Sequence, residues 1–368
     1  MMRVCHMSSA HRGLDIRIFE KECVSLANAG YETHLIITAS DEAVKKAAAK
    51  NVFLHAMPAS SGRFMRMFQH GWRCYWMARG IDADIYHFHD PELIPYGIIL
   101  SLSGKRVIYD SHEDLPRDIL DKEWIRPWMR RIVAKLSEVF EYIGARWFFS
   151  VVAATPFIAE RFKRVTSKSI DINNYPVPDE LTPAEVRSER CKNVCYIGSI
   201  SRARGLKPII EALPRVPDMG LILCGEFADK GFAEELRAMP GWSQVDYRGQ
   251  VNRDGVRSAL NESIAGMVTL LPTRAYLDSL PIKMFEYMAA GLPVISSDFP
   301  LWRRIVDGAQ AGICVDPMSS SAIVEALRNL SGHPMLAARM GEAGRQAVLE
   351  KYNWPNEAEK LINFYKNL

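Results

Sequence analysis

The sequence lacks the features that would assign it to several large protein classes at once. Its 368 residues contain no run of 18 or more uncharged apolar residues, so no membrane-spanning helix is expected. The first residues, MMRVCHMSSAHRGLD, lack the long apolar core of a secretory signal peptide. The phosphate-loop order Gly-x-x-x-x-Gly-Lys-Ser/Thr and the dinucleotide fingerprint Gly-x-Gly-x-x-Gly are both absent. A dehydrogenase is therefore disfavoured, and the missing His-Arg-Asp and Asp-Phe-Gly signatures disfavour a protein kinase.

Cysteine is scarce, and its pattern indicates neither a disulfide scaffold nor a metal site. The seven cysteines are irregularly spaced, and the closest pair, Cys191 and Cys195, has no His or Cys cluster beside it. Zinc binding is therefore disfavoured, and buried thiols in a reducing cytosol are expected. Apolar residues make up 48% of the chain and charged residues 24%, which predicts a globular protein with a sizeable core. The length favours two domains.

Acidic residues are missing from one long stretch, although the net charge of the chain is only +3. Between Ala43 and Ile81 there is no Asp or Glu, but there are seven basic residues: Lys45, Lys46, Lys50, Arg63, Arg66, Arg73 and Arg79. Large apolar side chains interleave with them in GRFMRMFQHGWRCYWMARG, and again in EWIRPWMRRIVAKLSEVF, Glu123 to Phe140. Such a surface suits peripheral contact with an anionic membrane, whereas core-facing helices with solvated arginines are the alternative. No nucleic-acid-binding motif accompanies the stretch, so nucleic acid is not expected as a partner.

Strand-like apolar runs alternate with helix-like segments along the whole chain. ADIYHFH, KRVIYDSH and FFSVVAATP in the first half, and VCYIGSI, MGLILCGEF and AGMVTLLP in the second, read as buried strands that helical segments follow. This order predicts parallel sheets covered on both faces. A polar, proline-containing joint lies between the two halves. We therefore predict an α/β fold of two doubly wound, Rossmann-like domains that face a cleft, at residues 1–172 and 193–350, with a linker at 173–192.

Ligands of such sheets bind at the carboxyl ends of the strands, so the strand-to-helix turns are the candidate sites. The first turn, SSAHRGLDIRIF, gathers His11, Asp15 and Arg17, where a structural turn needs only a cap. Asp15 is either that helix cap or part of an acceptor-facing loop. In the second turn, YHFHDPEL, His89 and Asp90 follow the strand, and Asp90 can cap the helix that Pro opens. These five residues are the candidates for the acceptor side.

The third turn, VIYDSHEDLP, has the densest charge of the first half, with Asp110, His112, Glu113 and Asp114 within five residues. A metal site built from these groups is the alternative reading, but they follow no recognised ligand spacing. We expect no metal ion, and we expect His112 to line the site as a hydrogen-bond donor or as an acid–base group.

In the second half, the turn YIGSISRARGLKPII combines glycines with positive charge. Gly198 ends a strand, Gly205 precedes a helix, and Arg202 and Arg204 lie between them. Backbone N–H groups at a helix start together with guanidinium groups form an anion site, for which a diphosphate is a natural ligand. Surface arginines on a loop are the alternative.

The segment DSLPIKMFEYMAAGLPVIS predicts a short helix followed by a strand. Asp278 or Ser279 can cap the helix, Pro281 suits its first turn, and Gly291 can end it with a left-handed cap. Phe285 is expected to face inward.

The other face of this helix has functional potential. Ile282, Lys283 and Glu286 share it by their three- and four-residue spacing. An anion is favoured near the helix start, where Lys283 adds positive charge. Glu286 can accept hydrogen bonds from vicinal hydroxyls, as a carboxylate does with a ribose diol. A Lys283–Glu286 surface ion pair is the alternative.

Taken together, these motifs resemble the GT-B glycosyltransferases of family 4. GSISRARGL, LILCGEF, YRGQV and DSLPIKMFEYMAAGLPVISSDFPLWRRIV are similar to the second domain of that family. HRGLDIRIFEKECVSLANAGYETHLI and YHFHDPELIPYG with VIYDSHED are similar to a bacterial surface-polysaccharide branch. The resemblance spans nearly the whole chain. YNWPNEAEKLINFY resembles the closing helix of the family, so residues 351–368 are expected to return to the first domain.

The resemblance implies roles for individual residues of the donor site. Glu286 is expected to bind the nucleotide ribose, and Asp278, where the family usually has Glu, to contact the hydroxyls of the donor sugar. Ser199 and Arg204 match the Arg and Lys of the family's phosphate turn. Because Ser199 carries no charge, Arg202 is expected to supply it.

Five further positions follow from the same resemblance. Gly249 and Val251 lie in the segment whose backbone borders the base. Pro281 and Ile282 replace a Gly-Leu pair whose amides bind the diphosphate, and Pro281 removes one of these N–H groups. His112 matches the active-site histidine of the first domain.

The implied activity is a retaining, metal-independent glycosyl transfer without a cofactor. A hexose-type sugar would pass from a nucleoside-diphosphate sugar, with UDP favoured, to a lipid-linked or growing cell-surface polysaccharide at the cytoplasmic face of the membrane. Positive groups and helix-start amides would stabilise the leaving diphosphate, which can itself act as the base, and domain closure would exclude water. The alternatives are a sugar-nucleotide epimerase, which needs no acceptor, and a nucleotide-sugar-binding partner that has lost catalysis.

Overall fold

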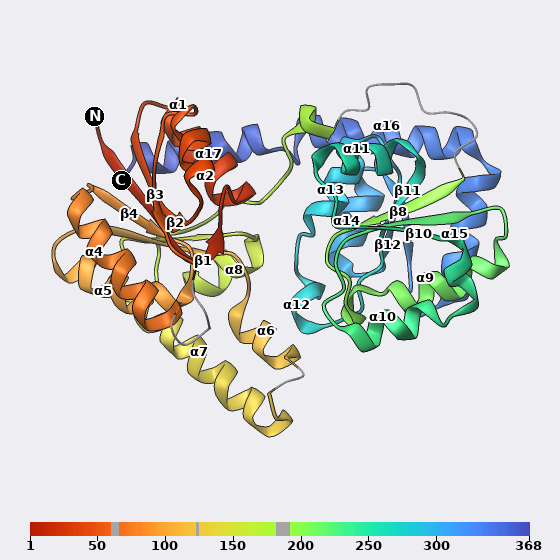
Figure 1. The fold of residues 1–368 in the computed structure, drawn as a ribbon, viewed down its shortest axis with the longest axis horizontal. Coiled ribbons are helices and arrows are strands. Elements are labelled where there is room, and N and C mark those ends of the chain that lie inside the picture. The colour runs from red at the N-terminus through yellow and green to blue at the C-terminus, as the bar shows by residue number, and fades with distance from the viewer. Residues whose placement is uncertain (60–65, 123–124, 182–191) are drawn as a thin grey trace. The chain divides into compact units, whose positions relative to one another are not determined.

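The computed structural model describes residues 1–59, 66–122, 125–181 and 192–368, and it divides into two compact units (Figure 1). The first unit combines Met1–Asn174 with Pro355–Leu368, and the second is Tyr175–Trp354. Each unit contains one parallel sheet with helices, which confirms the predicted pair of Rossmann-like α/β domains. The expected linker began at residue 173, but Tyr175 and Leu181 are buried in the core of the second unit.

The first unit is built on a seven-stranded parallel sheet with the order β3-β2-β1-β4-β5-β6-β7. Strand interiors such as Leu35–Ile37 are fully buried, as expected for a parallel sheet covered on both faces. The strands are β1 Arg3–Arg12, β2 Glu32–Thr38, β3 Val52–Met57, β4 Ile85–Phe88, β5 Arg106–Ser111, β6 Ser150–Ala153 and β7 Ser169–Asp171. His11 and Arg12 therefore end the first strand, whereas the sequence suggested that they belong to the turn.

The helices of this unit follow the predicted alternation, with one irregularity at the start. The segment after Asp15 was expected to be a regular helix, but its first eight residues form the π-helix η1, Ile16–Cys23, which continues as α1, Val24–Asn28. A π-helix bonds residues five apart, and π-turns are frequent at functional sites. The remaining elements are α2 Asp41–Ala48, η2 Arg66–His70, α4 Gly71–Ile81, η3 Pro91–Leu93, α5 Ile94–Leu102, α6 Leu115–Asp121, α7 Pro127–Trp147 and α8 Pro156–Lys163.

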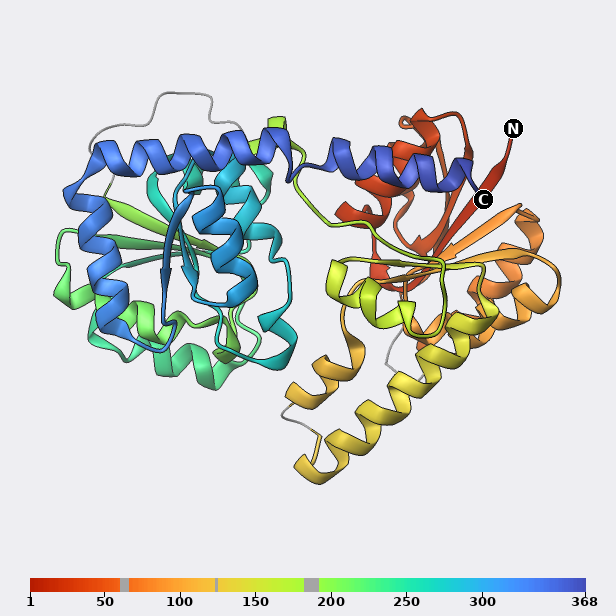
Figure 2. The same cartoon turned by 180° about the vertical axis from the view of Figure 1, so that it is seen from behind.

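The last helix, α17 (Trp354–Lys366), belongs to the first unit from Pro355 onward (Figure 2). Glu357 accepts a hydrogen bond from the backbone N of Asn173 at 2.7 Å, and Nζ of Lys360 lies 3.0 Å from Asp171. Tyr365 is buried, and its hydroxyl lies 2.7 Å from Nδ1 of His87 in β4. These contacts attach the C-terminal segment to β7, the residues after it, and β4 of the first sheet.

The second unit is built on a six-stranded parallel sheet with the order β10-β9-β8-β11-β12-β13. One apolar cluster forms around α13 and α14, and another forms around α9 and α15. The strands are β8 Asn193–Ile197, β9 Gly220–Cys224, β10 Val245–Gly249, β11 Ser263–Val268, β12 Val294–Ser297 and β13 Gly312–Val315. The helices are η4 Pro178–Leu181, η5 Arg202–Arg204, α9 Leu206–Ala212, η6 Leu213–Arg215, α10 Lys230–Arg237, η7 Pro240–Gln244, α11 Arg253–Asn261, α12 Arg274–Leu277, α13 Ile282–Ala289, α14 Pro300–Gly308, α15 Ser320–Gly332 and α16 Pro334–Glu350.

Two expectations from composition concern features outside the sheets. Within the described ranges, no helix is both long and apolar enough to cross a bilayer. All six cysteines that the structure describes are free thiols, and every one except Cys314 is buried. Cys191 lies outside the described residues.

Candidate functional site

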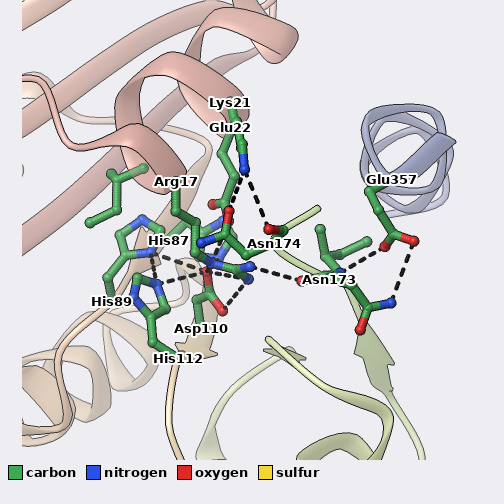
Figure 3. A network of polar contacts seen from close by, with 12 residues as sticks. Arg17, Lys21, Glu22, His87, His89, Asp110, His112, Asn173, Asn174 and Glu357 are labelled. Carbon is green, nitrogen blue, oxygen red and sulfur yellow. Dashed lines mark hydrogen bonds and ion pairs between the residues drawn. The ribbon is translucent and has the colours of Figure 1, made fainter. Parts of the chain in front are cut away.

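Polar side chains from three neighbouring strands of the first sheet meet in one buried cluster (Figure 3). His6 in β1 is in register with His87 in β4, and Asp110 lies near the end of β5. His89 and His112 follow β4 and β5 directly. The three strands are adjacent in the order β1-β4-β5, so residues far apart in sequence become neighbours at the edge where doubly wound sheets bind ligands.

Asp110 is the charged centre of this cluster, and Arg17 is its main partner. Nη2 of Arg17 lies 2.9 Å from Oδ1 and 3.1 Å from Oδ2 of Asp110, and Nε lies 3.2 Å from Oδ2. A further N–H of Arg17 donates to the carbonyl of Ile172 at 2.8 Å. Asp15 caps the π-helix that carries Arg17, because its carboxylate accepts from the backbone N of Arg17 and of Ile18, each at 2.9 Å. Of the two readings of Asp15, the structure shows the cap.

Imidazoles lead from the strand interior to His89, and the carboxylate of Asp110 links His89 to His112. Nδ1 of His6 lies 2.9 Å from Nε2 of His89, whose Nδ1 lies 3.2 Å from Oδ2 of Asp110. Nε2 of His112 is 3.1 Å from the same carboxylate oxygen and 3.0 Å from Nδ1 of His89. We assign N–H donors to Nδ1 of His89 and Nε2 of His112, because both face the ionised Asp110. In the neutral tautomer with this donor, Nδ1 of His112 is a hydrogen-bond acceptor.

Asp90 organises the end of β1 rather than the helix that follows it. Its carboxylate accepts from the hydroxyl of Ser8 at 2.8 Å and from the backbone N of Ser9 and Ala10 at 2.7 and 3.0 Å. It makes no side-chain hydrogen bond to the start of η3, so the predicted helix cap is wrong. The strand extends to Arg12, and its backbone N–H groups compete for this carboxylate.

His11 and Asp15 form the more accessible part of the site, beside the buried Asp90. Nδ1 of His11 lies 3.0 Å from Asp15 Oδ2, and Nε2 lies 3.6 Å from Asp90 Oδ1. Burial opposes protonation of His11, but its hydrogen bond to Asp15 and the charge of Asp90 raise its pKa above the usual value. The structure thus brings all five predicted acceptor-side residues and His112 into one connected network.

The three innermost histidines are neutral at physiological pH. Burial lowers the pKa of His89 to about 4, despite its hydrogen bond to Asp110. Burial also lowers the pKa values of His6 and His87 well below the usual range. Neutral imidazoles can donate at one nitrogen and accept at the other, so the chain can orient His112 without adding charge.

Glu22 adds a second buried carboxylate. Burial and the charge of Asp110 raise the pKa of Glu22 well above its usual value. Burial also opposes ionisation of Asp110, but the charge of Arg17 together with the contacts from His112 and His89 holds the pKa of Asp110 well below its usual value. Glu22, His87, His89 and Asp110 offer ligand atoms within 4.8 Å of one another and could hold a metal ion. Arg17 contacts both carboxylates, at 3.1 Å from Glu22, so a metal ion would compete with a guanidinium for them.

Sequence reasoning did not single out His6, Glu22 or Tyr365. His6 looks like an ordinary strand residue, and Tyr365 lies far away at the C-terminus. Arg17 and Glu22 are five residues apart, a spacing that places them on different faces of an α-helix. They face the same carboxylate cluster because η1 is a π-helix, with a wider turn. No signal in the sequence indicates that π-turn.

The glycine-rich turn of the second unit is shaped by close backbone contacts. Gly205 has φ +70°, and a Cβ atom there would lie 1.7 Å from the carbonyl oxygen of Thr269. Gly198 has φ +132°, so both turn glycines use conformations that other residues rarely adopt. Arg204 stacks over the ring of Tyr276 at 5.0 Å, whereas Arg202 pairs with Glu235 of α10. The structure therefore keeps Arg204 at the turn and directs Arg202 away toward α10.

Helix α13 begins later than the sequence suggested. It starts at Ile282 with Pro281 as the preceding residue, and Asp278 ends the short helix α12. The predicted cap at Asp278 or Ser279 is therefore wrong, because Asp278 follows the last residue of α12 and the hydroxyl of Ser279 donates to the carbonyl of Tyr276 in α12. Phe285 is fully buried as predicted, and Gly291 has the expected left-handed φ of +64°.

Glu286 on α13 is held by a partner that sequence reasoning missed. Nη1 of Arg253, at the start of α11, donates to Oε1 of Glu286 at 2.9 Å, and Nη2 bonds Glu180 at 2.9 Å. The alternative Lys283–Glu286 pair is not formed, because the ion pairs of Glu286 in the described structure run to Arg253. Lys283 instead places its Nζ 3.7 Å from the ring centre of Tyr196.

A cavity of about 370 Å³ opens at the carboxyl ends of β8 and β9. Its walls combine turn backbone with apolar side chains: Ile197, Gly198, Ser199, Cys224, Gly225, Glu226, Phe227, Ala228, Gln250, Val251 and Val256. Gly249 is bonded to this wall, because its carbonyl accepts from the N–H of Gly225 at 2.7 Å. The cavity thus joins two predicted regions, the phosphate turn at Ser199 and the base segment at Val251.

Comparisons with known proteins agree with this architecture. The family model described as "Glycosyl transferases group 1" matches residues 179–347, and "Glycosyltransferase Family 4" matches residues 21–172. Phosphatidyl-myo-inositol mannosyltransferase of Mycobacterium leprae is 24% identical over 307 residues, covering 80% of this chain and 75% of that protein. Alpha-maltose-1-phosphate synthase of Mycolicibacterium smegmatis is 24% identical over 263 residues, covering 66% and 67%.

Solved structures show the same fold over the full chain. Sucrose-phosphate synthase of Thermosynechococcus elongatus superposes with a TM-score of 0.78 at 16% identity, covering 100% of this chain and 99% of that one. HepE of Anabaena in complex with UDP-glucose gives a TM-score of 0.76 at 13% identity, with 100% coverage of both chains. The family models and the shared fold lead to one conclusion: the chain belongs to the GT-B glycosyltransferases of family 4.

Proposed function

We propose that this protein transfers a hexose-type sugar from a nucleoside-diphosphate sugar, with UDP favoured, to a lipid-linked or growing cell-surface polysaccharide. The observation that carries the proposal is the cavity that joins the glycine-rich phosphate turn to the segment around Val251. HepE, which has the same fold, was solved with UDP-glucose, and the mycobacterial relative is by name a mannosyltransferase of phosphatidyl-myo-inositol. The first supports the choice of UDP, and the second supports a lipid-linked acceptor.

In the proposed complex the nucleotide lies along the cavity of the second unit. The base stacks in the apolar part beside Val251 and the backbone of Gly249, and the ribose hydroxyls donate to Glu286. Arg253 binds Oε1 of Glu286, so Oε2 is available to the ribose. The donor sugar lies near Asp278.

The diphosphate lies against the turn of Gly198 and Ser199, where Arg204 supplies charge. The start of α13 contributes the N–H of Ile282 and the positive end of its dipole, although Pro281 has no N–H to offer. Arg202 pairs with Glu235 and would have to leave that partner to contribute.

The reaction we propose retains the anomeric configuration and needs no metal ion or cofactor. The bond between the anomeric carbon and the diphosphate oxygen breaks, the acceptor oxygen bonds to the same carbon from the same face, and the acceptor proton passes to the departing phosphate. Arg204 and the amides of the turn stabilise the charge that develops on the leaving group. On the first unit, His112 offers Nδ1 as an acceptor for a sugar or acceptor hydroxyl, and Asp110 holds its ring in place.

We also propose that the enzyme works at the inner face of the cell membrane, through α7. This helix projects beyond the sheet of its unit (Figures 1 and 2) and buries Ala134, Glu141, Gly144 and Ala145 on one face. Its other face exposes eight large apolar side chains, most of them at three- and four-residue spacing: Trp128, Met129, Ile132, Leu136, Val139, Phe140, Ile143 and Trp147. Trp128 and Leu136 are 65% and 64% exposed, which is unusual for a helix that faces only water.

Positive charge flanks this apolar face. The basic residues of the helix and its start are Arg126, Arg130, Arg131, Lys135 and Arg146. An apolar face rimmed by Lys and Arg, with Trp at both ends, suits insertion into an anionic interface. The basic stretch between Ala43 and Ile81 does not form one surface in the structure. Its helix α2 packs Ala47 on one face of the sheet, and its helix α4 packs Ala78 on the other. Arg63, Glu123 and Trp124 lie outside the described residues, as does the side chain of Arg66.

A nucleotide screen followed by a transfer assay tests the catalytic proposal. UDP or a UDP-sugar present at about 100 times its dissociation constant is expected to stabilise the folded protein by about 2.7 kcal/mol. Labelled sugar should then pass to a lipid extract, and both Glu286→Ala and Arg204→Ala should reduce nucleotide binding, whereas Arg257→Met should not. Conversion of the donor without an acceptor would indicate the epimerase, and binding without turnover would indicate an inactive partner.

Vesicle sedimentation tests the membrane proposal separately. The protein should sediment with anionic vesicles in low salt and dissociate in high salt, because the attraction between surface charges is screened. The double variant Trp128→Gln/Leu136→Gln should lose most of this binding, whereas Leu349→Gln, on an exposed apolar residue of the second unit, should keep it. Binding that ignores lipid charge and salt would refute the proposal.

A further inference from the structure

The amine of Lys283 has an environment that neither packing nor an ion pair explains. Lys283 is the second residue of α13; its stem is partly exposed, but Nζ itself is buried. Among the described residues, no group hydrogen-bonds to this Nζ. It lies over the ring of Tyr196 at 3.7 Å, and a Cβ atom at Gly198 would be only 3.1 Å away. Buried polar atoms without partners are few in folded proteins, and each requires a reason.

The charges around Lys283 do not compensate for its burial. Cys195 and Tyr196 on β8 and Arg204 on η5 face it, and Glu286 lies one turn further along α13. Glu286 is engaged by Arg253 at 2.9 Å. Burial, followed by the charge of Arg204, lowers the pKa of Lys283 well below its usual value. The start of α13 adds the positive end of the helix dipole, which also disfavours an ammonium group.

Nζ of Lys283 lies at a place where the phosphate turn has no positive charge of its own. Ser199 is neutral, Arg202 pairs with Glu235, and Arg204 stacks on Tyr276, so one cation remains at the turn itself. Lys283 reaches this turn from a different strand–helix unit, and its Nζ lies beside Gly198, whose backbone lines the cavity.

We propose that Lys283 binds the donor diphosphate in place of a basic residue at Ser199, and that its amine takes up a proton only when the donor binds. The inference rests on the proposed function, because it requires a diphosphate at this turn. In the empty site the lowered pKa of Lys283 favours the neutral amine, which lies over the ring of Tyr196. The diphosphate brings negative charge within reach, so the ammonium form gains charge-assisted hydrogen bonds that were missing before.

This coupling fixes the sign of the pH dependence. A bound diphosphate raises the pKa of Lys283 from its lowered value, so one proton is taken up from solution between the two pKa values. Affinity for the diphosphate must therefore fall as pH rises through that window, by up to about tenfold per pH unit for one proton. A permanently charged residue at the same position would bind without this dependence.

Calorimetry in several buffers measures the proton directly. UDP and GDP are each titrated into the full-length protein at pH 8, where the terminal phosphate of the nucleotide is already ionised, in buffers of different ionisation enthalpy. The slope of observed enthalpy against buffer enthalpy is expected to show the uptake of up to one proton for each nucleotide bound by the wild type. Lys230→Met, an exposed lysine at the start of α10, should behave like the wild type.

Two variants of Lys283 separate charge from folding. Lys283→Met should abolish proton uptake and weaken binding about 10- to 100-fold, the loss expected for a charge-assisted hydrogen bond. Lys283→Arg keeps a permanent charge, so it should bind with no proton uptake and with affinity independent of pH. If the wild type binds nucleotide without proton uptake, or if proton uptake persists in Lys283→Arg, the inference about Lys283 is overturned and the proposed function is not. Failure of the wild type to bind either nucleotide would overturn the proposed function together with it.

Discussion

The guanidinium of Arg17 forms an ion pair with the carboxylate of Asp110 at 2.9 Å in the interior of the first unit, and both side chains are almost fully buried. Asp110 in turn contacts His89 and His112, so this one ion pair supports the histidines around it. Its loss would leave a buried, unpaired charge at the carboxyl ends of β4 and β5.

Removal of Arg17 is therefore expected to destabilise the fold strongly. Arg17→Met leaves Asp110 buried without its cation, which typically costs about 3–5 kcal/mol. The double variant Arg17→Met/Asp110→Asn should recover part of this loss, because no charge then remains unpaired. Urea unfolding measures both. Lys46→Ala, which breaks an exposed pair with Glu42, should change little and serves as the control. Wild-type stability in Arg17→Met would contradict this account.

The neutral histidine chain makes a contribution to stability that acid removes. The pKa of His89 is lowered to about 4, and those of His6 and His87 lie well below the ordinary value of 6.5, so at these groups the unfolded state binds more protons between these limits. The stability that they contribute is thus lost as pH falls through 6.5, with a slope of about 1.4 kcal/mol per pH unit for each proton. Groups with raised pKa values, among them His11 and Glu22, oppose this effect.

Urea midpoints at pH 7.5, 6.5 and 5.5 check this slope. His6→Gln removes one titrating group from the buried chain and should flatten the dependence, whereas His333→Gln, at an exposed position, should leave it unchanged. The same slope in the wild type and in His6→Gln would show that the buried imidazole of His6 does not titrate as described.

Arg253 is expected to act on nucleotide binding through Glu286. In Arg253→Met, the carboxylate of Glu286 loses the 2.9 Å contact that orients it. Affinity for UDP should therefore fall, but by less than in Glu286→Ala. In a double-mutant cycle the two effects should not add, because they concern one contact. Arg257→Met, one turn further on α11 and paired with Asp254, is the matched control. Additive losses measured by calorimetry would indicate that Arg253 binds the ligand independently.

Gly205 is expected to tolerate no side chain. In Gly205→Ala the Cβ atom would lie 1.7 Å from the carbonyl oxygen of Thr269, and φ is +70°, so the backbone of the phosphate turn must move. The positive φ alone costs about 1–2 kcal/mol, and the clash adds to it. Gly308→Ala, where nothing lies within 4 Å and φ is not positive, should be neutral or slightly stabilising. Thermal unfolding and UDP affinity of the two variants provide the comparison.

Much of the candidate site could be predicted because it depends on local chemistry at strand ends. His112, His89 and Asp90 follow apolar strands, and in a parallel sheet the carboxyl ends of adjacent strands meet. The same reasoning located Arg204 on its turn. It failed at Asp90 as a helix cap, because that carboxylate binds the end of β1, far away in the sequence. It also failed at Asp278 or Ser279 as a cap of α13, because Asp278 ends the short helix α12 instead.

The sequence by itself determined the two parallel α/β domains, since the alternation of apolar strands and helices leaves few other ways to bury those strands. Only the tertiary structure decided which charges meet. A π-helix directs Arg17 and Glu22 together onto Asp110, and a helix 84 residues away from Ser199 supplies Lys283 to its turn. Such pairings depend on strand order and on how far a side chain reaches in space, and periodicity along the chain carries information about neither.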